Sequence, residues 1–290
     1  MYLSHDTLAR CIDGLQRQVY RDFEVIFVDS SPDQRSADII PRTSNVRLVR
    51  SEKRLWMFAA RNLGVTHAQG TILVFTDPDC IPAPDWLSQL DESFRQGHKV
   101  VGGPVAPASD EYRQRLAHFV KFWRWLPGGI SGSIPDQPTA NLAVDRGLFE
   151  SVGRFSEQFI ACDTLFCSQV RENGYEIFFN AQAVVEHMHE GVTLKSLVRE
   201  RFRRGVDFAQ MRSSLRGWST LQSVFFLTTF WLLPFRHLLW KAIMAAQRGV
   251  LGPLLVLSAL ILLGDYAWMV GQATTFWRQL WKLPPIQIMR

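Results

Sequence analysis

The sequence contains few cysteines, and none is paired at the short spacing typical of metal-binding motifs. Such sparse cysteines are typical of proteins from a reducing compartment. The first 14 residues are polar and lack the apolar core segment of a signal peptide. Both absences favour a domain that folds in the cytoplasm. The four cysteines are Cys11, Cys80, Cys162 and Cys167.

The sequence also lacks a clean run of about 20 apolar residues, the length that crosses a bilayer as a helix. Two stretches, at about 221–240 and 249–271, come near that length, but Arg236 and Asp265 interrupt them. We therefore expect a globular domain over 1–217, followed by a membrane-associated tail with two hydrophobic segments over 218–290. Either both segments span the membrane, or they lie in its plane or form a re-entrant hairpin.

The chain has a formal net charge of +5 and a pI of about 9.2, a balance that is often seen in nucleic-acid-binding proteins. Here the basic residues gather directly before the apolar tail, where anionic lipid headgroups would be their neighbours. We therefore expect a membrane partner and no nucleic acid. The residues concerned are Arg199, Arg201, Arg203, Arg204, Arg212 and Arg216.

If both segments span, the flanks of the tail carry nine basic residues and the connecting region carries three. The positive-inside rule then predicts that the globular domain lies on the cytoplasmic side of the inner or plasma membrane. The nine comprise the six arginines above with Arg278, Lys282 and Arg290, and the three are Arg236, Lys241 and Arg248.

A short apolar run at 71–76 ends in Asp77-Pro78-Asp79. Residues two apart on an extended chain point to the same side, so the two carboxylates can face one ligand. Hard divalent cations are commonly held by one or two carboxylates together with substrate phosphates. The run therefore predicts a cation and nucleotide-diphosphate site, although a polar turn after a strand is the simpler alternative.

Strand-like and helical patterns alternate along the first two hundred residues, which is typical of an α/β domain. Residues 23–29 form an apolar run that ends in Asp29, and residues 5–19 carry apolar positions at helical spacing. Three further runs, at 46–49, 100–105 and 141–144, predict additional strands.

Several motifs in this order resemble the family 2 nucleotide-sugar glycosyltransferases, which have a GT-A fold, a Rossmann-like mixed sheet flanked by helices. They are Ala-Ala-Arg-Asn-Leu-Gly at 59–64, the acidic pair, Asn-Leu-Ala at 141–143, Val-Gly-Arg-Phe-Ser-Glu at 152–157 with the later Asp163, and Asn-Gly-Tyr at 173–175. The resemblance runs from about Leu8 to about Gly205. A typical member has one more strand before the helix at His5, so we expect the first strand to be missing here.

The resemblance implies which residues bind the donor. Asp29 would contact the nucleoside base, Arg61 the diphosphate or base, and Asp77 the ribose side. Asp79 would hold Mg²⁺ or Mn²⁺, and His187 would lie near the metal. The alternatives are a helix cap for Asp29, a surface position for Arg61 and a strand-end hydrogen bond for His187.

The resemblance also implies an inverting transfer with Asp163 as the general base. A Glu-Asp pair is usual here, but Cys162 stands in place of the Glu, and Gln169 stands where an Arg is common. Since Asp163 opens a predicted helix, capping that helix is the competing role.

Residues 106–138 interleave aromatic and basic side chains and then become rich in glycine. We interpret this segment as a mobile acceptor loop near the membrane surface, with Trp123, Trp125 and the later Asn141 on the acceptor side. A helix packed into the core with a glycine-rich return is the alternative.

Processive members of the family carry Gln-x-x-Arg-Trp at a position where this chain has Arg204-Gly205. We therefore predict transfer of a single sugar to a lipid-linked or cell-surface saccharide, as in polysaccharide biosynthesis. One alternative is a nucleotidyltransferase that makes activated sugars. Such an enzyme would carry a glycine-rich, arginine-containing phosphate loop near its N-terminus, and the sequence shows none. A degenerate membrane partner that keeps the GT-A fold without activity is the other alternative.

Overall fold

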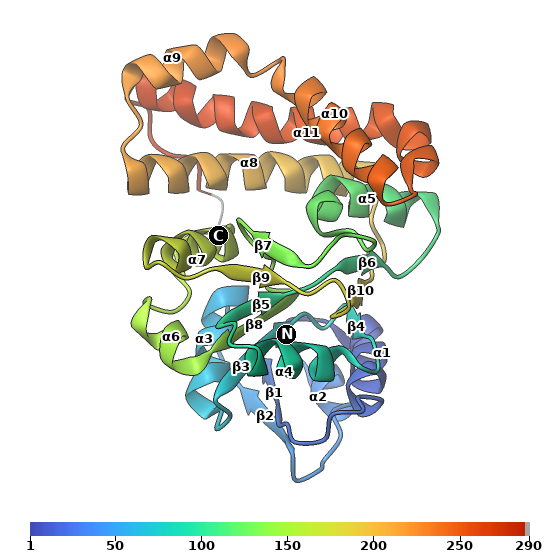
Figure 1. Ribbon diagram of the computed structural model, residues 1–290. Coiled ribbons are helices and arrows are strands. Elements are labelled where there is room, and N and C mark those ends of the chain that lie inside the picture. Colours follow the sequence, from blue (N-terminus) through green and yellow to red (C-terminus); the bar gives the residue numbers. More distant parts are fainter. Residues whose placement is uncertain (288–290) are drawn as a thin grey trace. The chain divides into compact units, whose positions relative to one another are not determined.

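The computed structural model describes residues 1–287, so Arg290 of the topology argument lies outside the described residues. The chain forms two compact units. Unit 1 consists of Met1–Ala108, Trp125–Gln158 and Cys162–Glu190. Unit 2 consists of Ser109–Arg124, Phe159–Ala161 and Gly191–Arg290. Figure 1 labels their helices and strands, and each unit is described by itself.

The largest sheet of unit 1 has five strands in the order β3-β8-β5-β9-β7. Strand β8 pairs antiparallel with both β3 and β5, β9 pairs parallel with β5, and β7 pairs antiparallel with β9. The sheet is therefore mixed, as in a GT-A domain. The strands are β3 (Ile72–Thr76), β5 (Val100–Gly102), β7 (Gly132–Ile134), β8 (Asn141–Asp145) and β9 (Ile177–Phe179).

Two smaller sheets complete unit 1. Strands β1 (Val25–Asp29) and β2 (Val46–Arg50) pair in parallel, and the backbone of Met1 hydrogen-bonds to Val28 of β1 and to Ser30, which follows it. The third sheet has the order β4-β10-β6. Its strands are β4 (Cys80–Pro82), β6 (Val105–Pro107) and β10 (Val185–His187).

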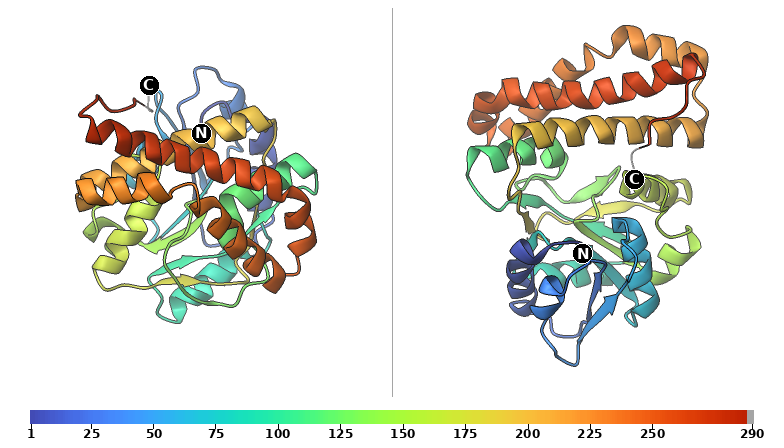
Figure 2. Two further views of the ribbon diagram at one scale, coloured as in Figure 1. Left: turned by 90° about the horizontal axis from the view of Figure 1, so that it is seen from above. Right: turned by 180° about the vertical axis from the view of Figure 1, so that it is seen from behind.

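The helices of unit 1 pack on the sheets through apolar faces. Helix α1 (His5–Gln16) and helix α3 (Met57–His67) lie on opposite sides of β1 and β2 (Figure 2). Phe155 lies at the centre of an aromatic core, with its ring 5.0 Å from the rings of Phe75, Phe149 and Phe166. The remaining helices are α2 (Arg35–Asp38), α4 (Trp86–Arg95), α6 (Arg146–Ser151) and α7 (Cys162–Glu172).

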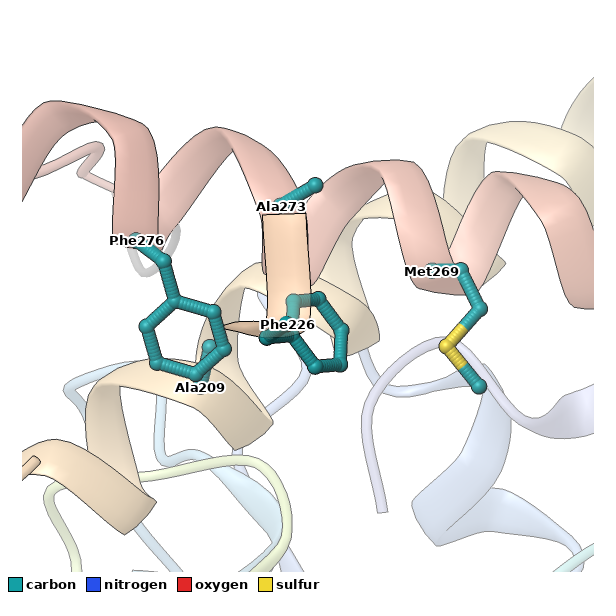
Figure 3. Close-up of a cluster of buried hydrophobic side chains, with 5 residues drawn as sticks. All are labelled: Ala209, Phe226, Met269, Ala273 and Phe276. Carbon is teal, nitrogen blue, oxygen red and sulfur yellow. The ribbon is translucent and has the colours of Figure 1, made fainter. Parts of the chain in front are cut away.

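Unit 2 is helical. It contains α5 (Tyr112–Phe122), α8 (Leu194–Arg216), α9 (Thr220–Thr229), α10 (Leu233–Gln247) and α11 (Leu251–Leu280), and a 3₁₀ turn, η1 (Trp123–Trp125), follows α5. Figure 3 shows the core where α8, α9 and α11 meet, formed by Ala209, Phe226, Met269, Ala273 and Phe276.

Two glycines allow α8 and α11 to approach closely. A Cβ atom at Gly205 would lie 2.0 Å from the carbonyl oxygen of Trp268, and one at Gly271 would lie 2.2 Å from that of Phe202. Contacts this short do not occur for real side chains, so the backbones of the two helices meet directly.

The expectation of two long hydrophobic helices in the tail is not met. The first stretch is divided into α9, of 10 residues, and α10, of 15 residues, while α11 has 30 residues. Pro234 stands in the first turn of α10, where its missing N–H costs nothing. Within residues 1–287, one helix, α11, has the length and apolar composition needed to cross a membrane.

Candidate active site

The acidic pair lies where β3 ends. Thr76 is paired with Asn141 of β8, and the chain then turns through Asp77 and Asp79 into β4. The backbone N–H of Cys80 donates to the carbonyl oxygen of Asp77 at 3.0 Å, which closes the turn. Both carboxylates are partly exposed. A rigid strand and a hydrogen-bonded turn therefore deliver two acids to the surface.

His187 approaches the same turn from β10. Strands β10 and β4 are antiparallel neighbours, and His187 is paired with Cys80. The N–H of Met188 donates to the carbonyl oxygen of Asp79 at 2.8 Å. As a result, His187 Nε2 lies 3.7 Å from Asp79 Oδ2. That separation exceeds a hydrogen bond, and it suits two ligands of one ion better than a direct contact.

Four side chains at this turn could hold a metal ion. Asp77, Asp79, Cys80 and His187 each offer one ligand atom, and these atoms all lie within 4.8 Å of one another. The Nδ1 atom of His187 lies 2.7 Å from the carbonyl oxygen of Met188, so an N–H on Nδ1 would leave Nε2 as a metal-binding lone pair. Carboxylates with one imidazole suit Mn²⁺ or Mg²⁺.

The thiols of Cys11 and Cys80, which lie beside the two acids, are held in their protonated form and are therefore poor metal ligands. Burial, together with the smaller effect of the nearby charges of Asp79 and Asp77, raises the pKa of the Cys11 thiol to about 12. Burial likewise raises the pKa of Cys80 well above its ordinary value, with the same two acids adding to the effect. The carboxylates and His187 are therefore the better candidate ligands in the cluster.

Arg61 on α3 forms an ion pair with Asp77 through Nη2. Its side chain is only 10% exposed, so the alternative of an ordinary surface arginine is wrong. The Nε and Nη1 atoms are buried and have no hydrogen-bond partner in the described part of the chain. Buried donors of this kind are costly unless a ligand satisfies them, and phosphate oxygens suit a guanidinium.

Asp29 is fully buried at the end of β1. One of its oxygens, Oδ1, accepts hydrogen bonds from the N–H and the hydroxyl of Ser31, at 3.0 and 2.7 Å. The other, Oδ2, lies 3.9 Å from Arg50 Nε and accepts no hydrogen bond from the described residues. The next helix, α2, has Gln34 at its N-cap position, so Asp29 is not its cap.

Asp163 is the second residue of α7, in its first turn. Its Oδ1 accepts a hydrogen bond from the N–H of Thr164 at 2.8 Å. Because α7 begins at Cys162, the N-cap position belongs to Ala161, which argues against a capping role for Asp163. The segment before α7 is tied to the helix that carries Arg61, since Asn62 exchanges two hydrogen bonds with the backbone of Phe155, at 2.8 and 3.3 Å.

Asn141, which we expect on the acceptor side from the sequence, lies in the core of the domain. Asn141 is fully buried, and its Oδ1 accepts from the indole N–H of Trp86 at 2.8 Å. Its amide nitrogen donates to the carbonyl oxygens of Pro104 and Ala183, at 2.9 and 2.7 Å. The side chain therefore joins strands in the core and has no surface for a ligand.

The segment with the two tryptophans is not a loop throughout. Helix α5 runs from Tyr112 to Phe122 and buries Leu116 through Val120, so the alternative of a packed helix is the better description. The indole N–H of Trp125 donates to the carbonyl oxygen of Asp136 at 2.9 Å. Trp123 belongs to unit 2, where Lys241 Nζ lies 5.8 Å from its ring centre. No observation among the described residues tests either tryptophan against an acceptor.

The sequence reasoning missed Asp207, a residue of α8 that lies within unit 2. Its Oδ2 accepts hydrogen bonds from the N–H groups of Ile160 and Ala161, at 2.8 and 3.0 Å. These two residues directly precede α7. The signal in the sequence was one of only two acids in a basic helix, the other being Glu200, and nothing local reveals the hydrogen-bond partners of Asp207.

An α/β domain with a mixed sheet, an acidic pair at a strand end and a buried arginine beside it defines the class of GT-A glycosyltransferases. A model of glycosyl transferase family 2 matches residues 1–153, and the chain belongs to that family. It is therefore a glycosyltransferase.

Curated relatives agree with this assignment. The chain is 26% identical to the glycosyltransferase AglE of Haloferax volcanii over 231 residues, and this match covers 74% of each protein. It is 31% identical to human polypeptide N-acetylgalactosaminyltransferase 15 over 177 residues. This match covers 51% of this chain but only 28% of that enzyme.

Solved structures share the fold. A mannosyltransferase of Pyrobaculum calidifontis, in complex with GDP-mannose and Mn²⁺, superposes with a TM-score of 0.63 at 22% identity, over 97% of this chain and 85% of that one. The enzyme GalNAc-T7, with UDP, GalNAc and Mn²⁺, gives a TM-score of 0.52 at 16% identity, over 72% and 48% of the chains.

Proposed function

We propose that the protein transfers one sugar, with inversion, from a nucleotide-diphosphate sugar to a lipid-linked or cell-surface saccharide. The observation that carries this proposal is the arrangement of Asp79 and His187 with ligand atoms 3.7 Å apart, beside an arginine whose two remaining donors are buried and unsatisfied. Cation ligands and phosphate donors thus adjoin one another at the end of one strand.

Asp79 and His187 would hold Mg²⁺ or Mn²⁺, which neutralises negative charge on a departing diphosphate. Both similar solved structures contain Mn²⁺ together with a nucleotide. Asp77 remains paired with Arg61 and faces the ribose side. Arg61 Nε and Nη1 donate to phosphate oxygens, and the second oxygen of Asp29 accepts from the nucleoside.

Asp163 would act as the general base. An inverting transfer requires a group that takes the proton of the acceptor hydroxyl as its oxygen attacks the anomeric carbon opposite the leaving diphosphate. The first turn of a helix stabilises the ionised carboxylate that this task needs.

Membrane association would bring the site to its acceptor. The long apolar helix α11 supports this part of the proposal, and so do the basic residues of α8, which precedes the tail. The catalytic domain would then lie on the cytoplasmic face of the inner or plasma membrane, where anionic lipid headgroups would meet the basic residues of α8.

Donor binding tests the proposal directly. We expect titration calorimetry of the full chain with GDP-mannose and UDP-N-acetylgalactosamine to give binding of one of them that requires Mn²⁺ or Mg²⁺. Asp79→Ala should abolish the metal-dependent part and leave the thermal midpoint unchanged, because the side chain is partly exposed. Asp85→Ala, on an exposed residue after β4, serves as the control. Equal affinity in EDTA and in Mn²⁺ would contradict a metal-dependent donor site.

A further inference from the structure

Helix α11 is held to α8 along much of its length. The backbones touch at Gly205 and Gly271, as described above. Near the other end, the hydroxyl of Ser213 donates to Gln279 Oε1 at 3.2 Å. The core cluster that includes Ala209 of α8 and Phe276 of α11 lies between these points (Figure 3). The two helices therefore form one packed structure.

Helix α8 is too polar to enter the hydrocarbon of a bilayer. Nine of its 23 residues are charged. Charged side chains are expensive at the centre of a membrane and are found there mainly at functional positions. If α11 crossed the bilayer, it would either draw α8 in or separate from it and open the core of unit 2. The lengths of α9 and α10, at 10 and 15 residues, fall short of the roughly 20 that a spanning helix needs.

Unit 2 nevertheless exposes much apolar surface. Of the 26 large hydrophobic side chains exposed in the described chain, 16 lie between Leu221 and Leu283. On α11 they include Val256, Leu263, Val270 and Trp277, which stand seven residues apart and form one stripe, with Val256 86% exposed. Soluble monomers rarely expose apolar patches of this extent without a partner.

The charges of this region identify the partner. Between residues 217 and 287 the only acid is Asp265, which is buried and holds Lys241 Nζ at 2.7 Å with both of its oxygens. Arg236 and Lys282 are exposed. An apolar surface with cations and no exposed acid suits an anionic lipid surface. A second copy of the same face would instead bring cations against cations.

We propose that the exposed apolar face of α9, α10 and α11 inserts into one leaflet of an anionic membrane, with α11 parallel to the membrane plane and not across it. This face is called the lipid face below. The proposal refines the membrane association suggested under the proposed function, and its experiments separate the two.

Sidedness distinguishes the two orientations of α11. In the full chain, Gln287→Cys places an exposed thiol after the C-terminal end of α11, and Glu52→Cys marks unit 1. The four native thiols are buried and give little background. With α11 in the membrane plane, an impermeant maleimide labels both positions from the same side of cell-derived membrane vesicles. Labelling from opposite sides would establish a crossing helix and overturn the proposal, while leaving membrane association intact.

Vesicle binding tests the lipid face itself. We expect the purified full chain to sediment with vesicles of phosphatidylglycerol and phosphatidylcholine. The triple variant Phe225→Ser, Leu239→Ser and Val256→Ser should bind at least tenfold more weakly, since all three side chains are exposed. The matched control replaces three exposed side chains of unit 1, Val19→Ser, Ile130→Ser and Tyr175→Ser, and should bind like the parent.

Unchanged binding of the triple variant would overturn the lipid face. A second outcome would also overturn it: a parent protein that forms dimers and does not bind vesicles, with a triple variant that is monomeric. In that case a second copy of the chain would cover the face. A parent that neither binds vesicles nor remains with membranes would contradict both this inference and the proposed membrane association.

A second inference rests on a different observation, the two hydrogen bonds that Asp207 accepts from Ile160 and Ala161. The carboxylate is 2% exposed, so these bonds are protected from water. Ile160 and Ala161 stand directly before α7, and a buried backbone N–H outside a helix or sheet needs a partner, which the carboxylate of Asp207 supplies. The geometry assigns Asp207 as a positioning residue that fixes the entry to α7, two residues before Asp163.

This assignment rests on the proposed role of Asp163, and a double-mutant cycle tests it. We expect Asp207→Ala to lower kcat by about 10- to 100-fold with little change in the donor KM, after correction for the folded fraction. In the Asp163→Asn background, Asp207→Ala should cause almost no further loss, because residues that act as a unit are not additive. Asp207→Asn keeps one acceptor oxygen, and it replaces the Ala variant if that one does not fold.

Equal loss from the Asp207 substitution in both backgrounds would make Asp207 purely structural and overturn the assignment. Near-normal turnover of Asp163→Asn alone would instead remove the proposed base, whatever the Asp207 variants do.

Discussion

The N–H of Met188 donates to the carbonyl oxygen of Asp79 at 2.8 Å, and this bond fastens the acidic turn to the end of β10. Because His187 is the neighbouring residue, the same bond sets the position of its imidazole, 3.7 Å from the Asp79 carboxylate. The ring of His189 stacks on that of His187 with centres 4.5 Å apart. Backbone pairing and ring packing thus hold the imidazole ready before any ligand binds.

We predict that His187→Gln raises the Kd for Mn²⁺ by about 10- to 100-fold, the range seen when metal-site residues are altered. The donor should then bind more weakly at a fixed Mn²⁺ concentration and recover when Mn²⁺ is raised. Titration followed by the Mn²⁺ EPR signal measures this. His67→Gln, at the end of α3, is the matched control. An unchanged Kd would exclude His187 from the metal site.

We predict that Asp163→Asn lowers turnover by about 10²- to 10⁴-fold, the range of a lost general base, while donor affinity stays the same. Asn keeps the shape of Asp but not its basicity. Since Ala161 holds the N-cap position of α7, the thermal midpoint should change little. Transfer rate, donor affinity and midpoint are measured on one preparation. Reduced activity that only follows the folded fraction would count against a catalytic Asp163.

We predict that Gly205→Ala destabilises unit 2, because the new Cβ would meet the carbonyl oxygen of Trp268 at 2.0 Å and force α8 and α11 apart. Overpacking of this kind costs about 1–3 kcal/mol. Gly252→Ala on α11 is the control, since a Cβ there meets no atom within 4 Å. The control should be neutral or slightly stabilising, as Ala favours helix over Gly. Denaturant unfolding compares the variants, and equal stability of both would refute the close packing.

We predict that Asp265→Asn or Lys241→Met, each alone, lowers the free energy of unfolding by about 3–5 kcal/mol, because each leaves a buried partner group uncompensated. Both side chains are almost fully buried. The double variant Lys241→Met with Asp265→Leu should recover most of the loss, since an apolar pair can replace a buried ion pair. Unfolding monitored by tryptophan fluorescence tests this. Additive losses in the double variant would mean that the two charges do not stabilise each other.

The sequence by itself determined the local elements and the acidic pair. The apolar run at 71–76 contains strand β3, and the two carboxylates after it lie partly exposed in the turn that leads to β4. The run that ends in Asp29 is β1, and the helix expected from Asp163 is α7, which begins one residue earlier. These features depend on side-chain periodicity within a few residues, so they can be read from the chain.

Contacts between distant residues were decided only by the tertiary structure. Hydrophobic periodicity does not say which strand lies beside which, so it could not reveal that β10 brings His187 to Asp79, or that Asn141 turns into the core. The roles of Asp29, Arg61 and Asp163 in catalysis stay predictions. In the tail, apolar composition is compatible with a spanning helix and with a helix packed on a charged neighbour. For α11, the backbone contacts with α8 at Gly205 and Gly271 favour the packed helix, and these contacts exist only once both helices are folded together.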